Sequence, residues 1–185
     1  MFALLSVLVF RSGLGGWDVA ALQAVEGLHG DVRDAVIHAV TQFGSWPSIT
    51  LLTVLAAALL LNRRPRAALF IVLAVAGAEM LEVTVKLLFG RPRPVVFTPL
   101  VHETSASFPS GHATVTAALT VAVCLVLWQT RARWAAVACG AAFVLLVSFT
   151  RVYLGVHYPS DLLAGWLVAT TWVALLVAAA PALLR

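Results

Sequence analysis

Six long apolar runs, separated by short polar connections, constrain the fold of this chain more than any other feature of its sequence. A transmembrane helix needs about 20 predominantly apolar residues to cross the hydrocarbon core of a bilayer. The chain is 62% hydrophobic and only 11% charged, whereas charged residues make up about 25% of an ordinary soluble domain. We therefore expect an all-α, polytopic membrane bundle of about six transmembrane helices in a single domain, residues 1–185, with runs at Met1–Phe10, Ser48–Leu61, Ala67–Val85, His112–Trp128, Trp134–Phe149 and Leu162–Leu184.

The N-terminal part of the chain departs from this pattern. The run 1–10 is too short to span a bilayer, and Arg11 interrupts it. Either the span continues through residues 13–17, or residue 1 lies within the natural first span. The sequence lacks a basic n-region and a small-residue cleavage site, which argues against a removable signal peptide. In the segment 17–43, charged and apolar side chains alternate, so we expect an amphipathic interfacial helix after the first span, broken near Gly30.

Three polar islands interrupt the apolar sequence, namely residues 86–94, 109–112 and 150–161. If the spans alternate in direction, all three islands lie at one membrane face and converge. Lys86, Arg93 and Arg151, called the cation cluster below, would then repel one another in surroundings of low dielectric constant. A bound phosphate would relieve that repulsion, because arginine binds phosphate oxygens bidentately and lysine adds a compact positive charge.

The second and third islands each begin an apolar helix. A proline precedes Ser110 and suits the first turn of a helix, so the free backbone amides of Ser110, Gly111 and His112 would point at a bound anion. Asp161 would lie in the first turn of the last helix. From there it can accept a hydrogen bond from one ring nitrogen of His157 and leave the other free to attack phosphorus. His112 is then available to protonate the leaving oxygen.

Arginines in the short turns indicate the orientation of the chain. The turn 62–66 carries three arginines, the turn 129–133 carries two, and the chain ends on Arg185. The positive-inside rule makes their common side cytoplasmic. Counted over the whole chain, six cations face six, so we treat the cation cluster as held by the site rather than as a topology signal. We thus expect a multi-pass plasma-membrane protein whose site faces away from the cytoplasm.

Together the islands resemble the three-part signature of the type-2 phosphatidic-acid phosphatase superfamily. The parts match as Lys86, six residues and Arg93-Pro94; as Pro109-Ser110-Gly111-His112; and as Arg151, five residues, His157, three residues and Asp161. The family usually has serine before the last arginine, and Thr150 keeps the hydroxyl there. The resemblance implies hydrolysis without metal or cofactor, through a phosphohistidine on His157. It also implies that His112 acts first as acid and later as base for water.

Two further charged residues are candidate substrate contacts, each with a second interpretation. Arg91 could hold the headgroup of a lipid substrate or anchor the chain at the membrane interface. Glu103 lies nine residues before His112 in the long polar loop. It could contact the substrate, shuttle a proton, or be an ordinary solvated carboxylate.

Three classes of function fit these residues. A lipid phosphatase is favoured, because no soluble domain is available to collect a dissolved substrate. We prefer a polyprenyl pyrophosphate as its lipid, with phosphatidylglycerol phosphate, phosphatidate and diacylglycerol pyrophosphate as alternatives. A vanadate-dependent haloperoxidase and a non-catalytic lipid-binding or transport protein are the other classes, and an intact His112, His157 and Asp161 argue against the last. The expected partners are the lipid substrate and the bilayer, not nucleic acid, and the sequence indicates no metal ligands and no particular oligomeric state.

Overall fold

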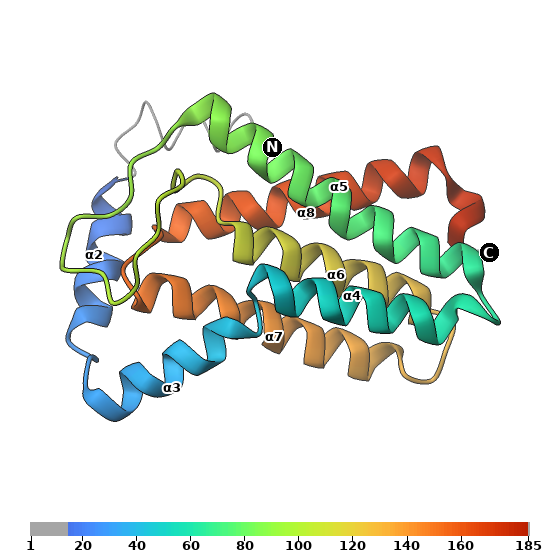
Figure 1. Cartoon of the computed structure of the whole chain (residues 1–185), viewed down its shortest axis with the longest axis horizontal. Coiled ribbons are helices and arrows are strands. Elements are labelled where there is room, and N and C mark those ends of the chain that lie inside the picture. The colour runs from blue at the N-terminus through green and yellow to red at the C-terminus, as the bar shows by residue number, and fades with distance from the viewer. Residues whose placement is uncertain (1–14, 185) are drawn as a thin grey trace.

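The computed structural model describes residues 15–184, and within that range every regular element is a helix. The all-α class expected from the sequence is confirmed. The apolar run 1–10 lies outside the described residues. The elements, labelled as in Figure 1, are α2 (Gly15–Glu26), α3 (Asp31–Gln42), α4 (Trp46–Leu61), α5 (Pro65–Phe89), α6 (Gly111–Leu127), α7 (Arg133–Tyr153), α8 (Pro159–Ala179) and the 3-10 turn η1 (Pro181–Leu184).

Three of the described helices are long and apolar enough to cross a membrane: α5, α7 and α8. The helices α3 and α4 meet this test only as a pair, bent by 45° at the break between them. Helix α6 is apolar but has 17 residues, which at 1.5 Å per residue gives about 26 Å and falls short of the roughly 30 Å hydrocarbon core. By length and composition the described residues thus provide three or four spans, and the expected number of about six stays a prediction.

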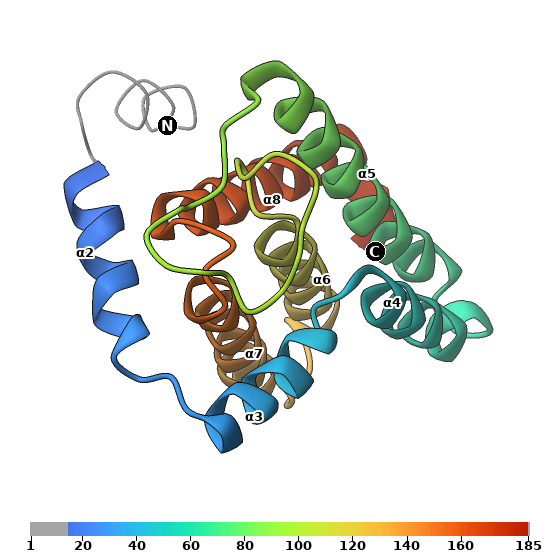
Figure 2. The same ribbon diagram turned by 60° about the vertical axis from the view of Figure 1, so that its left-hand side comes forward.

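Helix α6 lies at the centre of the bundle, in contact with α4, α5, α7 and α8, and Figure 2 shows it surrounded by these helices. Small side chains line its contacts: Ala117 and Ala118 form a buried cluster with Ala78 of α5 and Ala169 of α8. At Gly77 of α5 a Cβ atom would lie 2.2 Å from the ring of Trp172 in α8. Close packing of small residues is the usual basis of helix association in lipid, which explains how α6 fits at the centre.

The segment 17–43 forms two helices, α2 and α3, with a break at residues 27–30, as the sequence predicts. Figure 2 shows both helices across one end of the bundle, where α3 contacts α7 and α2 contacts α7 and α8. Polar contacts fasten them there. The hydroxyl of Tyr153 donates to Asp34 Oδ1 at 2.7 Å and to the carbonyl of Leu28 at 3.1 Å. The break between the helices is therefore attached to the end of α7.

The connections between the long helices lie at two opposite ends of the bundle. The turns 62–66 and 129–133 lie at one end, together with η1 (Figure 1). The loop 90–110 and the link 154–158 between α7 and α8 lie at the other end, beside α2 (Figure 1). The three polar islands therefore meet at one end of the molecule, as alternating spans predict.

Candidate active site

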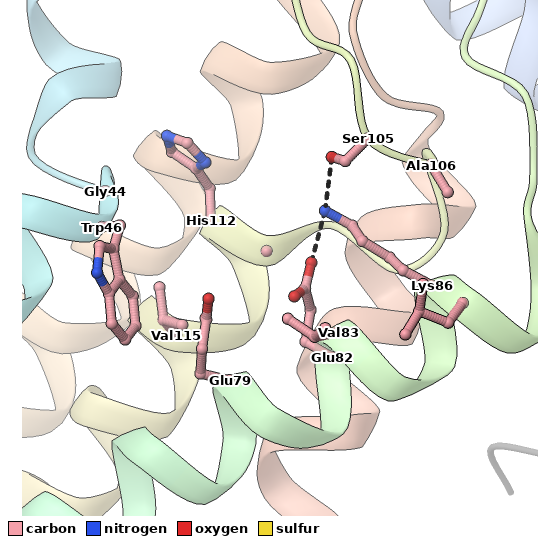
Figure 3. Close-up of a pocket in the computed structure, with 12 residues that line it drawn as sticks. Gly44, Trp46, Glu79, Glu82, Val83, Lys86, Ser105, Ala106, His112 and Val115 are labelled. Atoms are coloured by element: carbon pink, nitrogen blue, oxygen red, sulfur yellow. Dashed lines mark hydrogen bonds and ion pairs between the residues drawn. The ribbon is translucent and has the colours of Figure 1, made fainter.

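Lys86 lies in the last turn of α5, one turn after Glu82 on the same face. Its Nζ is 2.6 Å from Glu82 Oε1 and donates to Ser105 Oγ of the loop at 3.3 Å (Figure 3). Glu82 is 2% exposed, and a charge buried in an apolar helix is expensive unless it is paired. Glu82 thus neutralises Lys86, while Glu79 points into the cavity described below (Figure 3).

Arg93 is held by the loop that carries it and by the link before α8. Its Nε donates to the carbonyl of Ser105 at 2.8 Å, and one terminal nitrogen donates to the carbonyl of Val156 at 2.7 Å. That same nitrogen lies 3.3 Å from His157 Nε2. The backbone contacts therefore fix a guanidinium within hydrogen-bond distance of Nε2 of the histidine.

Arg151 lies in the last turn of α7 and is 2% exposed. Its two terminal nitrogens bind Glu103 Oε1 at 2.5 Å and Thr41 Oγ1 of α3 at 3.1 Å. Its Nε, which is buried, has no hydrogen-bond partner among residues 15–184. A buried guanidinium normally uses its donors, so this nitrogen is a suitable donor to a phosphate oxygen.

Glu103 places a carboxylate within the cation cluster. Besides its bond to Arg151, its Oε2 lies 3.9 Å from Arg93. Burial alone would raise the pKa of Glu103, but the charge of Arg151, its hydrogen bond and the charge of Arg93 together outweigh burial and lower the pKa below its usual value. The side chain is therefore charged at neutral pH. An incoming phosphate must compete with this carboxylate for the guanidinium of Arg151.

His157 and Asp161 face each other across one turn. Asp161 Oδ2 is 3.5 Å from His157 Nδ1, slightly long for a hydrogen bond. The same oxygen accepts hydrogen bonds from Ser107 Oγ and, at 2.9 Å, from the backbone amide of Tyr158. Because the carboxylate lies at Nδ1, the proton of a neutral imidazole belongs there, and Nε2 keeps its lone pair.

The protonation of His157 follows from its surroundings. The side chain is 2% exposed. Burial lowers the pKa of His157 well below its usual value, and the positive charges of Arg151 and Arg93 lower it further. The imidazole is therefore neutral at pH 7, the form that can act as a nucleophile.

His112 lies in the first turn of α6 and points into a cavity of about 400 Å³ between α4, α5, α6 and the loop (Figure 3). Lys86 and Glu79 line the same cavity, and Trp46, Val83 and Val115 supply an apolar part. Figure 3 shows His112 and Lys86 on either side of the start of α6. His157 and Arg151 are not among the residues that line this cavity, and Lys86 is the member of the cation cluster that does.

The start of α6 differs in part from the expectation. The backbone amide of Ser110 is not free, because it donates to the carbonyl of Asp161 at 3.0 Å. The hydroxyl of Ser110 is buried and has no hydrogen-bond partner among residues 15–184. At Gly111 a Cβ atom would lie 2.9 Å from Glu82 Oε1 and 3.8 Å from Lys86 Nζ. Gly111 thus allows α6 to begin next to the ion pair of α5.

Arg91 binds acidic groups of two helices. Its guanidinium binds Asp161 Oδ1 at 2.5 Å and Asp18 Oδ2 at 3.0 Å, donates to Ser160 Oγ at 2.7 Å, and lies 4.1 Å from the ring centre of Tyr158. Its role as a substrate contact stays a prediction, and these contacts support the further role proposed below.

Some residues whose side chains bind predicted site residues were not found by reasoning from the sequence, namely Asp18, Thr41, Ser105, Ser107 and Ser160. Ser105 and Ser107 lie in a loop without periodicity, and Asp18 and Thr41 lie in helices read only as interfacial. The one signal in the sequence was the charge of Asp18 beside apolar residues. If such an aspartate is buried, it needs polar partners.

Comparison with known proteins places this site in a family. A profile described as the PAP2 superfamily matches residues 67–185, more than half of the chain. The chain belongs to the PAP2 superfamily. The family expected from the sequence is confirmed, and with it the enzyme class, a hydrolase that acts on phosphate groups.

Individual relatives cover different shares of the chain. Phosphatidylglycerophosphatase B of Bacillus subtilis is 26% identical over 171 residues, which are 89% of this chain and 84% of that protein. An undecaprenyl-diphosphatase of Sulfolobus acidocaldarius is 42% identical over 73 residues. That match covers 40% of this chain, which spans about a third, 32%, of the Sulfolobus protein. The crystal structure of a transmembrane PAP2 type phosphatidylglycerolphosphate phosphatase from Bacillus subtilis superposes with a TM-score of 0.88 at 25% identity, over 97% of this chain and 92% of that one.

Proposed function

We propose that this protein is an integral-membrane lipid phosphatase that removes the terminal phosphate from a polyprenyl pyrophosphate through a phosphohistidine on His157. The observation that carries the proposal is the position of His157 Nε2. It faces the Arg93 guanidinium at 3.3 Å, while Asp161 and Ser107 lie at Nδ1. A neutral imidazole with its lone pair next to an anion-binding group is suited to attack phosphorus.

The proposed reaction has two steps. In the first, Nε2 of His157 bonds to phosphorus and the bond from phosphorus to the leaving oxygen breaks. His112, which is protonated when the negative charge of the bound phosphate offsets the nearby cations, gives that oxygen a proton. In the second, the now basic His112 takes a proton from water, whose oxygen bonds to phosphorus and releases phosphate from His157. Arg93, Arg151 and Lys86 stabilise the negative charge that builds up on the phosphoryl oxygens in both steps. Asp161 stabilises the positive charge on the imidazole ring.

The cavity beside His112 supports a lipid as the substrate. Its lining combines the polar groups of Lys86 and His112 with Trp46, Val83 and Leu87. These three apolar side chains are exposed on α4 and α5, Leu87 to 82%, on helices that are apolar enough to contact lipid. A lipid could thus extend its phosphate toward His112 while its chain stays between α4 and α5. A dissolved phosphate ester would gain nothing from this apolar side.

The relatives carry the names of different lipids. An undecaprenyl-diphosphatase is 42% identical over 73 residues, and a phosphatidylglycerophosphatase matches over most of the chain and in three dimensions. A lipid A 1-phosphatase is 42% identical over 77 residues. Phosphate release from detergent-dispersed undecaprenyl pyrophosphate, phosphatidylglycerol phosphate, phosphatidate and diacylglycerol pyrophosphate, all in EDTA, tests the proposal. We expect the pyrophosphate of the polyprenol to give the highest kcat/KM. Preference for phosphatidylglycerol phosphate would select the second lipid, and no release from any of them would reject the proposed function.

We also propose that the site faces away from the cytoplasm, with the arginine turns inside. Single cysteines at Asn62 and Thr98, both exposed, are introduced into a chain that lacks Cys124 and Cys139. A membrane-impermeant maleimide is expected to label position 98 in intact cells and position 62 only after permeabilisation. The reverse pattern would place the site on the cytoplasmic side.

The carboxylate of Glu103 is expected to weaken the binding of phosphate, because it occupies Arg151. Replacing Glu103 with glutamine keeps the shape and removes the charge. A partly exposed ion pair contributes about 1 kcal/mol, so we expect KM for the lipid and Ki for vanadate to fall about fivefold, with little change in kcat. Glu26→Gln, an exposed carboxylate of α2, is the matched control. A fall in kcat with unchanged Ki would instead assign Glu103 to proton transfer.

A further inference from the structure

A buried ionic network joins α2 to the start of α8, behind the proposed nucleophile. Asp18 of α2 is 0% exposed. It accepts hydrogen bonds from the backbone amide of Ser160 at 3.0 Å, from the hydroxyl of Ser160 at 2.6 Å, and from Arg91 at 3.0 Å. The other terminal nitrogen of Arg91 binds Asp161 Oδ1 at 2.5 Å. Arg91 is thus shared between two fully buried carboxylates.

The sharing determines which oxygen of Asp161 is free for the imidazole. Arg91 binds Oδ1, so Oδ2 is left for Ser107, the amide of Tyr158 and Nδ1 of His157. With Asp18 charged, the positive charge of Arg91 is divided between two anions, and Asp161 remains a good acceptor for Nδ1. Without the charge of Asp18, Arg91 would pair with Asp161 alone and draw electron density and the carboxylate itself away from His157.

We propose that Asp18 is a positioning residue for catalysis: acting through Arg91, it sets the orientation and basicity of Asp161 and thereby the nucleophilicity of His157. The inference rests on the proposed function of His157. It assigns a catalytic consequence to α2, which lies outside the three signature motifs and outside the part of the chain that the family profile matches. The competing interpretation is that Asp18 only fastens α2 to the bundle.

Charge counting separates the two interpretations. Asp18, Arg91 and Asp161 together carry a net charge of about −1. Asp18→Asn raises this to zero, Arg91→Gln lowers it to about −2 and leaves two buried carboxylates unpaired, and the double variant returns to about −1. If Asp18 acts on Asp161 through Arg91, replacing Asp18 cannot lower activity further once Arg91 is gone, so the double variant must be at least as active as Arg91→Gln alone. If Asp18 is only a structural contact, the second substitution removes one more hydrogen bond and can only reduce activity further.

The experiment compares wild type, Asp18→Asn, Arg91→Gln, the double variant and the control Glu26→Gln. For each purified protein, phosphate release from detergent-dispersed undecaprenyl pyrophosphate and the temperature of thermal unfolding are measured. We expect Asp18→Asn to lower kcat about tenfold to 100-fold, the effect of a slightly misplaced reacting group, with KM changed less than about twofold, because Asp18 does not touch the cation cluster. The double variant should equal or exceed Arg91→Gln in kcat, and Glu26→Gln should match wild type.

Several outcomes would overturn the proposal. The first is a wild-type kcat in Asp18→Asn. The second is a reduction of kcat in the double variant equal to the product of the two single reductions. The third is a kcat that follows the unfolding temperature alone across the variants. If Asp18→Asn does not fold, Ser160→Ala tests the same network from α8 and should lower kcat several-fold at constant KM. Failure of both variants to fold would assign the network to stability. The proposed function is judged separately, because it fails only if wild type releases no phosphate or His157→Ala retains activity.

Discussion

Replacement of His157 by alanine is expected to abolish phosphate release from every substrate while leaving the protein folded. The side chain is the one group in the described site whose free nitrogen faces the guanidinium of Arg93, so no neighbour can take over the attack. Loss of a nucleophile in a catalytic triad lowers kcat by about 10⁶-fold, and we expect a reduction of at least about 10⁴-fold here. His38→Ala, an exposed histidine of α3, serves as the control.

A direct test of the same prediction is the intermediate. Wild type mixed briefly with substrate labelled at the terminal phosphorus and quenched in base should carry label that is lost in acid, the behaviour of a bond from phosphorus to nitrogen. His157→Ala should carry none. Imidazole added to His157→Ala should restore some turnover, because the substitution leaves space for a free nucleophile. Label retained in His157→Ala would assign the nucleophile to another residue.

Replacement of His112 by alanine is expected to lower kcat by an amount that depends on the leaving group. General acids contribute about 10²-fold to 10⁴-fold, and that contribution is largest when the leaving oxygen is strongly basic. A lipid alkoxide leaving from phosphatidate needs the proton, whereas a lipid monophosphate leaving from a pyrophosphate needs it less. We therefore expect the loss on phosphatidate to exceed the loss on a matched diacylglycerol pyrophosphate by at least about tenfold.

The second step gives the variant a further signature. His112 also serves as the base that activates water, so a good leaving group should let phosphohistidine form and then persist. On an aryl phosphate, His112→Ala should therefore accumulate label on His157 above the wild-type level. Equal proportional losses on the monophosphate and the pyrophosphate, with no accumulated label, would remove the assignment as acid and base. His112 would then act like Arg93, as a group that stabilises phosphoryl oxygens.

The helices and most of the site could be predicted because spacing and hydropathy encode them locally. The apolar runs predict helices α4 to α8. The motif residues lie at the ends of those runs, so they converge if the spans alternate in direction. The positions of Arg93, Arg151 and His157 follow from that rule. Glu82 could also be predicted as the partner of Lys86, because residues four apart on a helix face the same way.

Contacts between distant segments could not be predicted in the same way. Ser160 and Asp18 are 142 residues apart in sequence, and no periodicity connects an interfacial helix with the first turn of α8. The amide of Ser110 was expected to be free, because the helix start alone leaves it unpaired, yet the carbonyl of Asp161 lies within reach. The acidic partners of Arg91 could not be predicted for a similar reason, since Asp18 and Asp161 belong to two distant helices, α2 and α8.

The different lengths of α5 and α6 set the start of α6, and with it His112, back from the end of α5. The two helices are level at the arginine turns, where Arg64 donates to the carbonyl of Val126. Helix α5 has 25 residues and α6 has 17, so α6 begins about 12 Å below the end of α5, and His112 lies at that depth. Withdrawing a chain from a membrane costs about 0.8 kcal/mol per CH₂, or roughly 13 kcal/mol for sixteen of them. A site at this depth avoids that cost, so turnover should follow the mole fraction of substrate within the bilayer rather than its total concentration in the sample.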